Sequence, residues 1–261
     1  MNSLRILVIG GLTTYRALFN WVSPWILVPS LLVMPLAQIL LFSYIGRSAG
    51  IESDTFFVVG NAVQYSALPC LLGTASTVVG ERLQRTLGIV LASPAPRLAL
   101  VIGRTLPVML NGLAVSVFGL VAGSVLLGLP VRPATLGLAT LAIAVSVFGC
   151  TGLGLVSAAV GLRLRDIAVL STILFGILLL CSGADIPRPA LPGWLAAAGD
   201  WLPLAHGIAA ARSVAAGGGI GGVGGDLAAE ALLGLGYGMA GVLMLRLLER
   251  RSRSAGALDL T

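Results

Sequence analysis

The sequence contains no lysine: all sixteen basic residues among its 261 are arginine. A chain without lysine has no residue for a Schiff base and no GxxxxGK[ST] loop to hold the phosphates of ATP. Charge of either sign is also scarce, at 10% of residues, against about 25% in ordinary globular domains. If the protein uses ATP, a second chain has to bind the nucleotide.

Cysteine and histidine are almost as rare, with Cys70, Cys150 and Cys181 each inside an apolar run and His206 as the only histidine. No spacing typical of a disulfide framework or a zinc site occurs. No serine, histidine and acid are arranged as a catalytic triad either. We therefore expect no metal, no catalytic residues and buried, inert thiols.

What the sequence does have is apolar length: 57% of its residues are hydrophobic, and the mean hydropathy is +1.01. A helix needs about 20 apolar residues to cross the hydrocarbon core of a bilayer. The pattern predicts an all-α polytopic membrane protein with six transmembrane helices. The six run approximately over residues 24–46, 55–79, 105–128, 135–161, 167–183 and 227–245.

The distribution of arginine predicts the orientation. With the N-terminus in the cytoplasm, twelve arginines lie on the inner side and four, Arg47, Arg132, Arg188 and Arg212, on the outer side. Cytoplasmic segments carry such an excess of basic residues. Both termini are then cytoplasmic, including a tail over residues 251–261, and the high pI reflects sidedness rather than nucleic-acid binding.

Two segments outside the spans are also distinctive. Residues 1–23 mix apolar side chains with arginine and tryptophan, which favours an amphipathic helix in the inner interface, although a frayed tail is the alternative. The extracellular segment 184–226 contains four prolines, so we expect short re-entrant or surface helices with Trp194 and Trp201 as anchors. The run GGGIGGVGG at its end predicts a flexible tether into the last span.

The stretch GERLQRTLGIVLASPAPR, residues 80–97, interrupts the apolar pattern between the second and third spans. Over residues 81–91, leucines and a valine recur at the spacing of one helix face, with the charged residues off it. Glu81 and Arg85 stand in the favourable order for a helical ion pair. This segment is either an interfacial anchor or a cytoplasmic helix whose polar face a soluble partner contacts.

This stretch resembles the cytoplasmic loop of permease subunits of type-2 ABC exporters, whose pattern E-R-x-x-G-T-x-E-x-x-x-x-[ST]-P forms the coupling helix. Glu81, Arg82, Thr86, Ser93 and Pro94 match, whereas Arg85 replaces a glycine and Gly88 an acid. LRLRD at residues 162–166 is similar to the family's next cytoplasmic link. SGADIPRPALPGWL and LPLAHGIAAAR resemble two later runs of the same family, in the same order.

The resemblance implies a transport subunit, not an enzyme, in the bacterial plasma membrane. It implies export or efflux of drugs, antibiotics, lipids or glycans, here with a lean toward a small amphiphile. A second permease, identical or related, and a cytoplasmic ATPase that binds ATP and Mg²⁺ would be the partners. The implied ATPase-coupling residues are Glu81, Arg82, Arg85, Thr86 and Leu87. Arg163, Arg165 and Asp166 would make a secondary cytoplasmic contact, and Asn61, Gln64 and Tyr65 would line the substrate path.

Other interpretations of the polar residues stay open. Asn61, Gln64 and Tyr65 could instead bond across a packed helix interface. Glu230 suits either a helix start at the outer headgroups or, in a secondary transporter or channel that works alone, a proton-carrying acid, a role that Asp166 could share. A membrane scaffold is a third possibility. An integral-membrane enzyme has the least support, because no nucleophile, base and metal ligands converge.

Overall fold

The structure is a computed structural model that describes residues 24–83, 97–130, 132–162 and 167–254. Within these ranges it consists of helices and their connections, without a strand. Five helical segments are long and apolar enough to cross a membrane, and the expected fifth span is a shorter apolar helix, Ala168–Cys181. The prediction of an all-α membrane fold is confirmed at this level.

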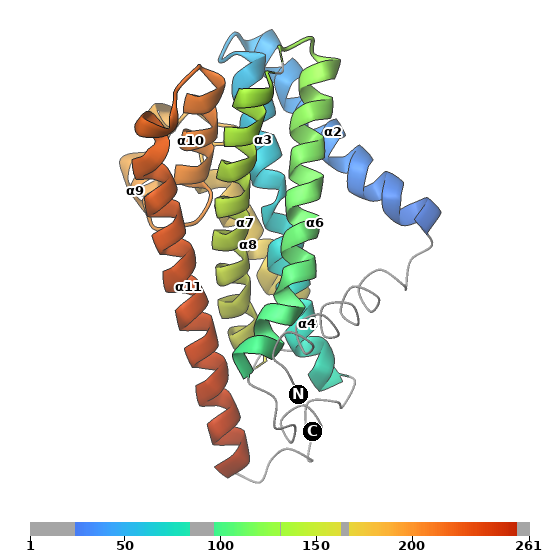
Figure 1. The fold of residues 1–261 in the computed structure, drawn as a ribbon, viewed down its shortest axis with the longest axis vertical. Coiled ribbons are helices and arrows are strands. Elements are labelled where there is room, and N and C mark those ends of the chain that lie inside the picture. The colour runs from blue at the N-terminus through green and yellow to red at the C-terminus, as the bar shows by residue number, and fades with distance from the viewer. Residues whose placement is uncertain (1–23, 84–96, 131, 163–166, 255–261) are drawn as a thin grey trace.

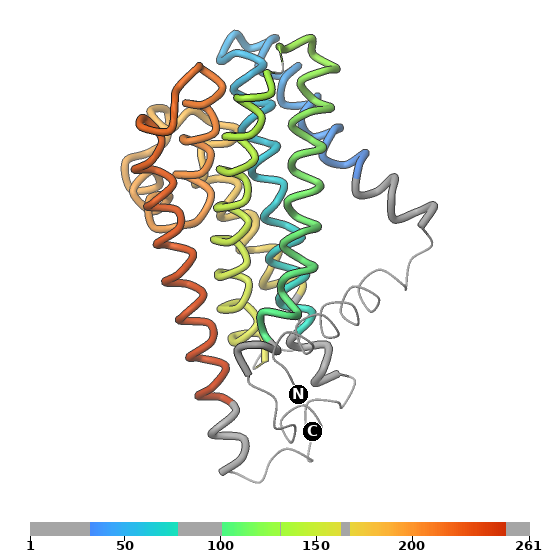
Figure 2. Tube along the Cα trace, in the orientation of Figure 1, coloured from blue at the N-terminus to red at the C-terminus, as the bar shows by residue number. Residues whose placement is uncertain are grey.

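The helices pack around α7, which contacts α4, α6, α8, α10 and α11 (Figure 1). Short elements after α8 gather beside the beginning of α11, at the end of the bundle where α6 passes into α7 (Figure 2). The elements in chain order are α2 (Pro24–Ala49), α3 (Asp54–Tyr65), α4 (Ala67–Leu83), α6 (Arg97–Leu126), α7 (Pro133–Gly161), α8 (Ile167–Cys181), η1 (Arg188–Ala190), α9 (Gly193–Asp200), α10 (Ala205–Ala215) and α11 (Ile220–Ser254).

The expected second span, residues 55–79, is two helices in the structure. α3 ends at Tyr65, and α4 begins at Ala67 after a turn at Ser66. Pro69 lies in the first turn of α4 and has no N–H to donate to the carbonyl of Tyr65, so the helical ladder is interrupted there. α4 then continues through Glu81 and Arg82 to Leu83, so no break separates the span from the first residues of the predicted coupling helix.

The prediction of a flexible glycine tether before the last span is wrong for most of its length. α11 begins at Ile220 rather than near residue 227, so six residues of GGGIGGVGG are helical. Glycine costs about 1 kcal/mol relative to alanine in a helix. Val223 offsets part of that cost because its side chain is buried in the main hydrophobic core. A helix also satisfies its own backbone groups, which apolar surroundings require.

Glycines bring α7 and α11 close together. A Cβ atom added to Gly152 would lie 2.7 Å from the carbonyl oxygen of Gly234 and 2.9 Å from the amide nitrogen of Gly238. A Cβ on Gly241 would lie 2.6 Å from Leu155 Cβ. Small residues permit such backbone contact between membrane helices, which associate through van der Waals packing.

We expect Gly152→Ala to lower the free energy of unfolding by roughly 1–3 kcal/mol, because the added methyl group forces α11 away from α7. Gly236→Ala is the matched control, since a Cβ there meets nothing within 4 Å. Thermal unfolding in detergent compares the two variants with the wild type. Equal losses in both would show that backbone contact does not hold the two helices together.

Candidate functional site

The predicted path residues Asn61 and Gln64 are buried, with 1% and 0% of their surfaces exposed, and Tyr65 is half-buried. Asn61 accepts a hydrogen bond from Gln38 Nε2 at 3.0 Å and donates to Asp185 Oδ1 at 2.8 Å. These bonds connect α2, α3 and the segment after α8. Asn61 and Gln64 thus lie in the packed interior of the protein. In this conformation neither side chain is accessible to a substrate.

Gln64 and Asp185, which lie in or beside this hydrogen-bonded cluster, have polar atoms without a partner among the described residues. Both polar atoms of the Gln64 amide and the Oδ2 atom of Asp185 are buried without a hydrogen bond. A buried polar group left unpaired costs about 1–3 kcal/mol, so native structures contain few of them. Gln64 and Asp185 are therefore the places in this cluster with unused hydrogen-bonding capacity.

Arg212 of α10 connects three segments of the chain. Its Nη1 donates to the carbonyl oxygen of Gly183 at 2.9 Å, its Nη2 to that of Ala184 at 2.8 Å, and both its Nε and Nη2 to that of Phe56. The guanidinium also lies 3.4 Å from the centre of the Phe56 ring. Gly60 leaves room for it, because a Cβ there would lie 2.5 Å from Nη2. The planar, five-donor guanidinium suits several carbonyl acceptors at once.

Burial changes the titration of two groups in this cluster. It raises the pKa of Asp185 to about 6, opposed by the hydrogen bond from Asn61 and the charge of Arg212. It lowers the pKa of Arg212 to about 10, opposed by the charges of Glu52 and Asp185. Arg212 therefore remains a cation at neutral pH, and Asp185 is ionised there at a cost.

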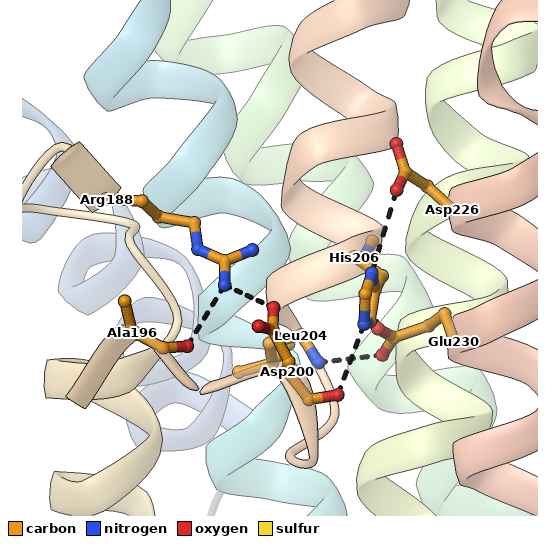
Figure 3. Close-up of polar contacts among 8 residues, drawn as sticks. Arg188, Ala196, Asp200, Leu204, His206, Asp226 and Glu230 are labelled. Carbon is orange, nitrogen blue, oxygen red and sulfur yellow. Dashed lines mark hydrogen bonds and ion pairs between the residues drawn. The ribbon is translucent and has the colours of Figure 1, made fainter. Parts of the chain in front are cut away.

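A second cluster surrounds the beginning of α10 (Figure 3). Glu230, from α11, is fully buried and accepts hydrogen bonds from the backbone amides of Leu204 at 2.7 Å and Gly207 at 3.1 Å. His206 Nδ1 lies 3.6 Å from Asp226 Oδ1, and its Nε2 lies 3.2 Å from the carbonyl oxygen of Asp200. Asp200 also pairs with Arg188, which donates to the Ala196 carbonyl at 3.1 Å.

The structure corrects the prediction that Glu230 lies at the start of the last helix, because α11 already begins at Ile220 and Glu230 is buried further along it. The first amides of a helix have no partner within it, and α10 begins without a side-chain cap of its own. Leu204, before α10, has a φ of 91°, a left-handed conformation that costs a non-glycine residue about 1–2 kcal/mol. The carboxylate from α11 supplies the missing acceptors. Its place in an apolar run was the signal, but its partners lie more than twenty residues away along the chain.

The remaining expected sites lie mostly outside the described residues. The expected interfacial helix over residues 1–23 lies outside the described residues. So do six of the expected contact residues, Arg85, Thr86, Leu87, Arg163, Arg165 and Asp166. The backbone of Glu81 and Arg82 belongs to the last turn of α4. Their coupling and contact roles stay predictions. Trp194, within α9, and Trp201, directly after it, are 73% and 75% exposed. Short helices of this kind were expected between the last two spans.

Comparison with protein families gives one match. The model of a family described as ABC-2 type transporter matches residues 11–215, which is more than three quarters of the chain. The chain belongs to the ABC-2 type transporter family. No curated protein matches it. Family membership and the apolar helices make the ABC-2 chain a multi-pass membrane protein and a transport permease component.

In this ABC-2 permease, we expect Arg212→Lys to lower the free energy of unfolding by roughly 2–4 kcal/mol. Lysine keeps the charge but loses the fork that contacts three carbonyl groups and the Phe56 ring. Arg132→Lys is the matched control, because Arg132 is exposed and its side chain caps nothing. Thermal unfolding in detergent measures both, and a similar small change in each would show that the Arg212 contacts add no stability.

The raised pKa of Asp185 predicts a pH dependence. The folded state holds this proton up to about pH 6, whereas unfolded aspartate releases it near pH 3.9. Its stabilisation is thus complete below about pH 4 and is lost as the pH rises to about 6, by roughly 3 kcal/mol. We expect Asp185→Asn to reduce the pH dependence of the free energy of unfolding over this range. An unchanged slope in the variant would assign the dependence to another group.

Proposed function

We propose that this chain is the membrane-spanning permease of an ATP-driven exporter, powered by a separate cytoplasmic ATPase that binds ATP and Mg²⁺. The observation that carries the proposal is the family match over residues 11–215. The sequence supports the division of labour, because a chain without lysine has no phosphate-binding loop of the GxxxxGK[ST] type. Two permeases, identical or related, pack side by side in the assembly.

In the proposed topology the chain crosses the membrane six times, with α8 as the short fifth span and both termini inside. The helix ends support it. Arg97 begins α6, and Arg246, Arg250, Arg251 and Arg253 lie in the C-terminal part of α11. At the other end of the bundle, the connection between α6 and α7 contains one arginine, Arg132. An excess of arginine on one side marks the cytoplasmic face.

Cysteine labelling tests the orientation. We expect Trp194→Cys to react with a membrane-impermeant maleimide in intact cells, and Arg253→Cys to react only after the membrane is opened. The native cysteines give little background, since Cys70, Cys150 and Cys181 are all buried. The opposite labelling pattern would reverse the topology, and with it the side on which the ATPase binds.

The proposed coupling element is the segment 81–91 that follows α4 without a break at its start. The ATPases close on ATP, push on this segment, and bias the bundle between an inward-open and an outward-open state. Because Glu81 and Arg82 belong to the end of α4, a push there is transmitted along α4 to α7, against which it packs. Arg163, Arg165 and Asp166 make the second contact.

Replacing Glu81 and Arg85 together by alanine tests the coupling. We expect the permease to remain folded but to lose substrate-stimulated ATP hydrolysis by its co-purified ATPase at least tenfold, because the polar face that the ATPase contacts is gone. Arg132→Ala, at the other end of the bundle, is the control and should leave hydrolysis unchanged. Normal hydrolysis and transport in the double variant would reduce the segment to a membrane anchor.

The proposed substrate path includes Asn61, Gln64 and Tyr65, closed in this conformation. The unpartnered amide of Gln64 supports a role in a second state, because a hydrogen-bonding group that the closed bundle does not use remains available when α3 moves. The substrate is an amphiphile, which an apolar pathway with few polar groups suits. Vesicle transport with the co-purified ATPase, screened over lipids and drug-like amphiphiles, identifies it.

A further inference from the structure

Helix α10 is held by a charged side chain at each end. At its beginning the Glu230 carboxylate of α11 accepts from the amides of Leu204 and Gly207. Near its end, its own Arg212 donates to carbonyl groups of α3 and of the segment after α8. α10 therefore connects α11 to α3. The hydrogen bonding of its first turn depends on α11, the last helix of the chain.

The pocket around the Glu230 carboxyl group is lined by glycine and by one unused hydroxyl. A Cβ on Gly149 would lie 3.1 Å from Oε1 and 3.0 Å from Pro203 Cβ, so a side chain there would crowd the carboxyl group. A Cβ on Gly207 would lie 1.8 Å from Ser146 Oγ and 3.6 Å from Glu230 Cδ, which makes the hydroxyl and the carboxyl group neighbours across Gly207. Ser146 Oγ is fully buried and has no hydrogen-bond partner among the described residues.

We propose that Glu230 is a positioning residue whose carboxylate joins α10 to α11 through the hydrogen bonds from the Leu204 and Gly207 amides, together called the latch. Uptake of one proton weakens this latch. The proton binds Oε2 and the bond from the Gly207 amide to that atom breaks. The unpartnered Ser146 side chain then rotates to accept a hydrogen bond from the new O–H. The bond from the Leu204 amide to Oε1 remains. A carboxylate accepts at both oxygens, whereas the neutral acid donates at one of them. The first turn of α10 therefore loses one of its hydrogen bonds to Glu230.

Other titratable groups face this pocket and have to be separated from Glu230. His206 lies on α10, Asp226 stands one turn earlier on α11, and the thiol of Cys150 approaches from α7. Arg188 and Asp200 form their own ion pair on the far side of His206 (Figure 3). None of these side chains donates to or accepts from the Leu204 and Gly207 amides in the described structure.

Hydrogen exchange of the purified permease in nanodiscs tests the latch directly, and it needs neither ATPase nor substrate. We expect Glu230→Gln to lower the protection factors of the amides between Leu204 and Gly207 roughly tenfold or more, because a charge-assisted bond is lost. Asp226→Asn, the neighbouring acid, is the matched control and should leave them unchanged. Equal protection in wild type and Glu230→Gln would overturn the proposal.

A pH profile separates a titrating latch from a merely structural contact. When the pH is lowered from alkaline to acid, we expect protection of this turn to fall in the wild type and to stay low at every pH in Glu230→Gln. Ser146→Ala removes the acceptor for the new O–H, so its midpoint should move to lower pH. His206→Gln should keep the midpoint.

The profile also decides the case if Glu230→Gln does not fold. A flat wild-type profile, or a midpoint that disappears in His206→Gln, would overturn the proposal. The consequence for transport rests on the proposed function: acid on the outer side should change the rate of ATP-driven transport in the wild type but not in Ser146→Ala over the same range. If acid leaves the transport rate unchanged while the hydrogen-exchange profile is as expected, that outcome counts against the proposed function alone.

Discussion

A short helix placed inside an apolar bundle has to find partners for the polar groups at its ends. The arrangement of side chains around α10 follows from that requirement. The first amides of α10 have no acceptor of their own, and Glu230 of α11 provides two. Arg212 then ties the same helix to α3 and to the segment after α8. Charged side chains are rare in this chain. Two of them, Glu230 and Arg212, join elements that are distant in the sequence.

Close packing of the long helices makes that arrangement possible. Gly149, Gly152 and Gly234 let the backbones of α7 and α11 approach each other. Gly149 also leaves space for the Glu230 carboxyl group, and Gly207 leaves space for the Ser146 hydroxyl beside it. An alanine at these positions would fill the pocket or push α11 outward. The glycines therefore have two roles, one in helix association and one in admitting a buried acid, and both depend on the absence of a side chain.

Much of the fold could be predicted from composition and periodicity. The apolar runs predicted the long helices because length and hydropathy are local properties, and the prolines after α8 predicted that the connection would be broken into short helices. The turn at Ser66 was missed, although Pro69 was its signal, because an apolar run longer than twenty residues hides an interruption. The start of α11 was also missed, because glycine propensity favours a loop and the burial of Val223 reverses that preference.

By itself, the sequence determined the class of the molecule: helices of membrane length, an arginine bias between their ends, and no lysine with which to bind ATP. It could not determine which other elements Asn61, Glu230 and Arg212 contact, because their partners on those elements are 23 to 156 residues away along the chain. Only the tertiary structure decided that Asn61 joins α2 to the segment after α8, that Glu230 caps α10, and that Arg212 reaches α3. The physical reason is that a helix pattern specifies which residues share a face, whereas the hydrogen-bond partner of a buried polar group depends on which helix packs against that face.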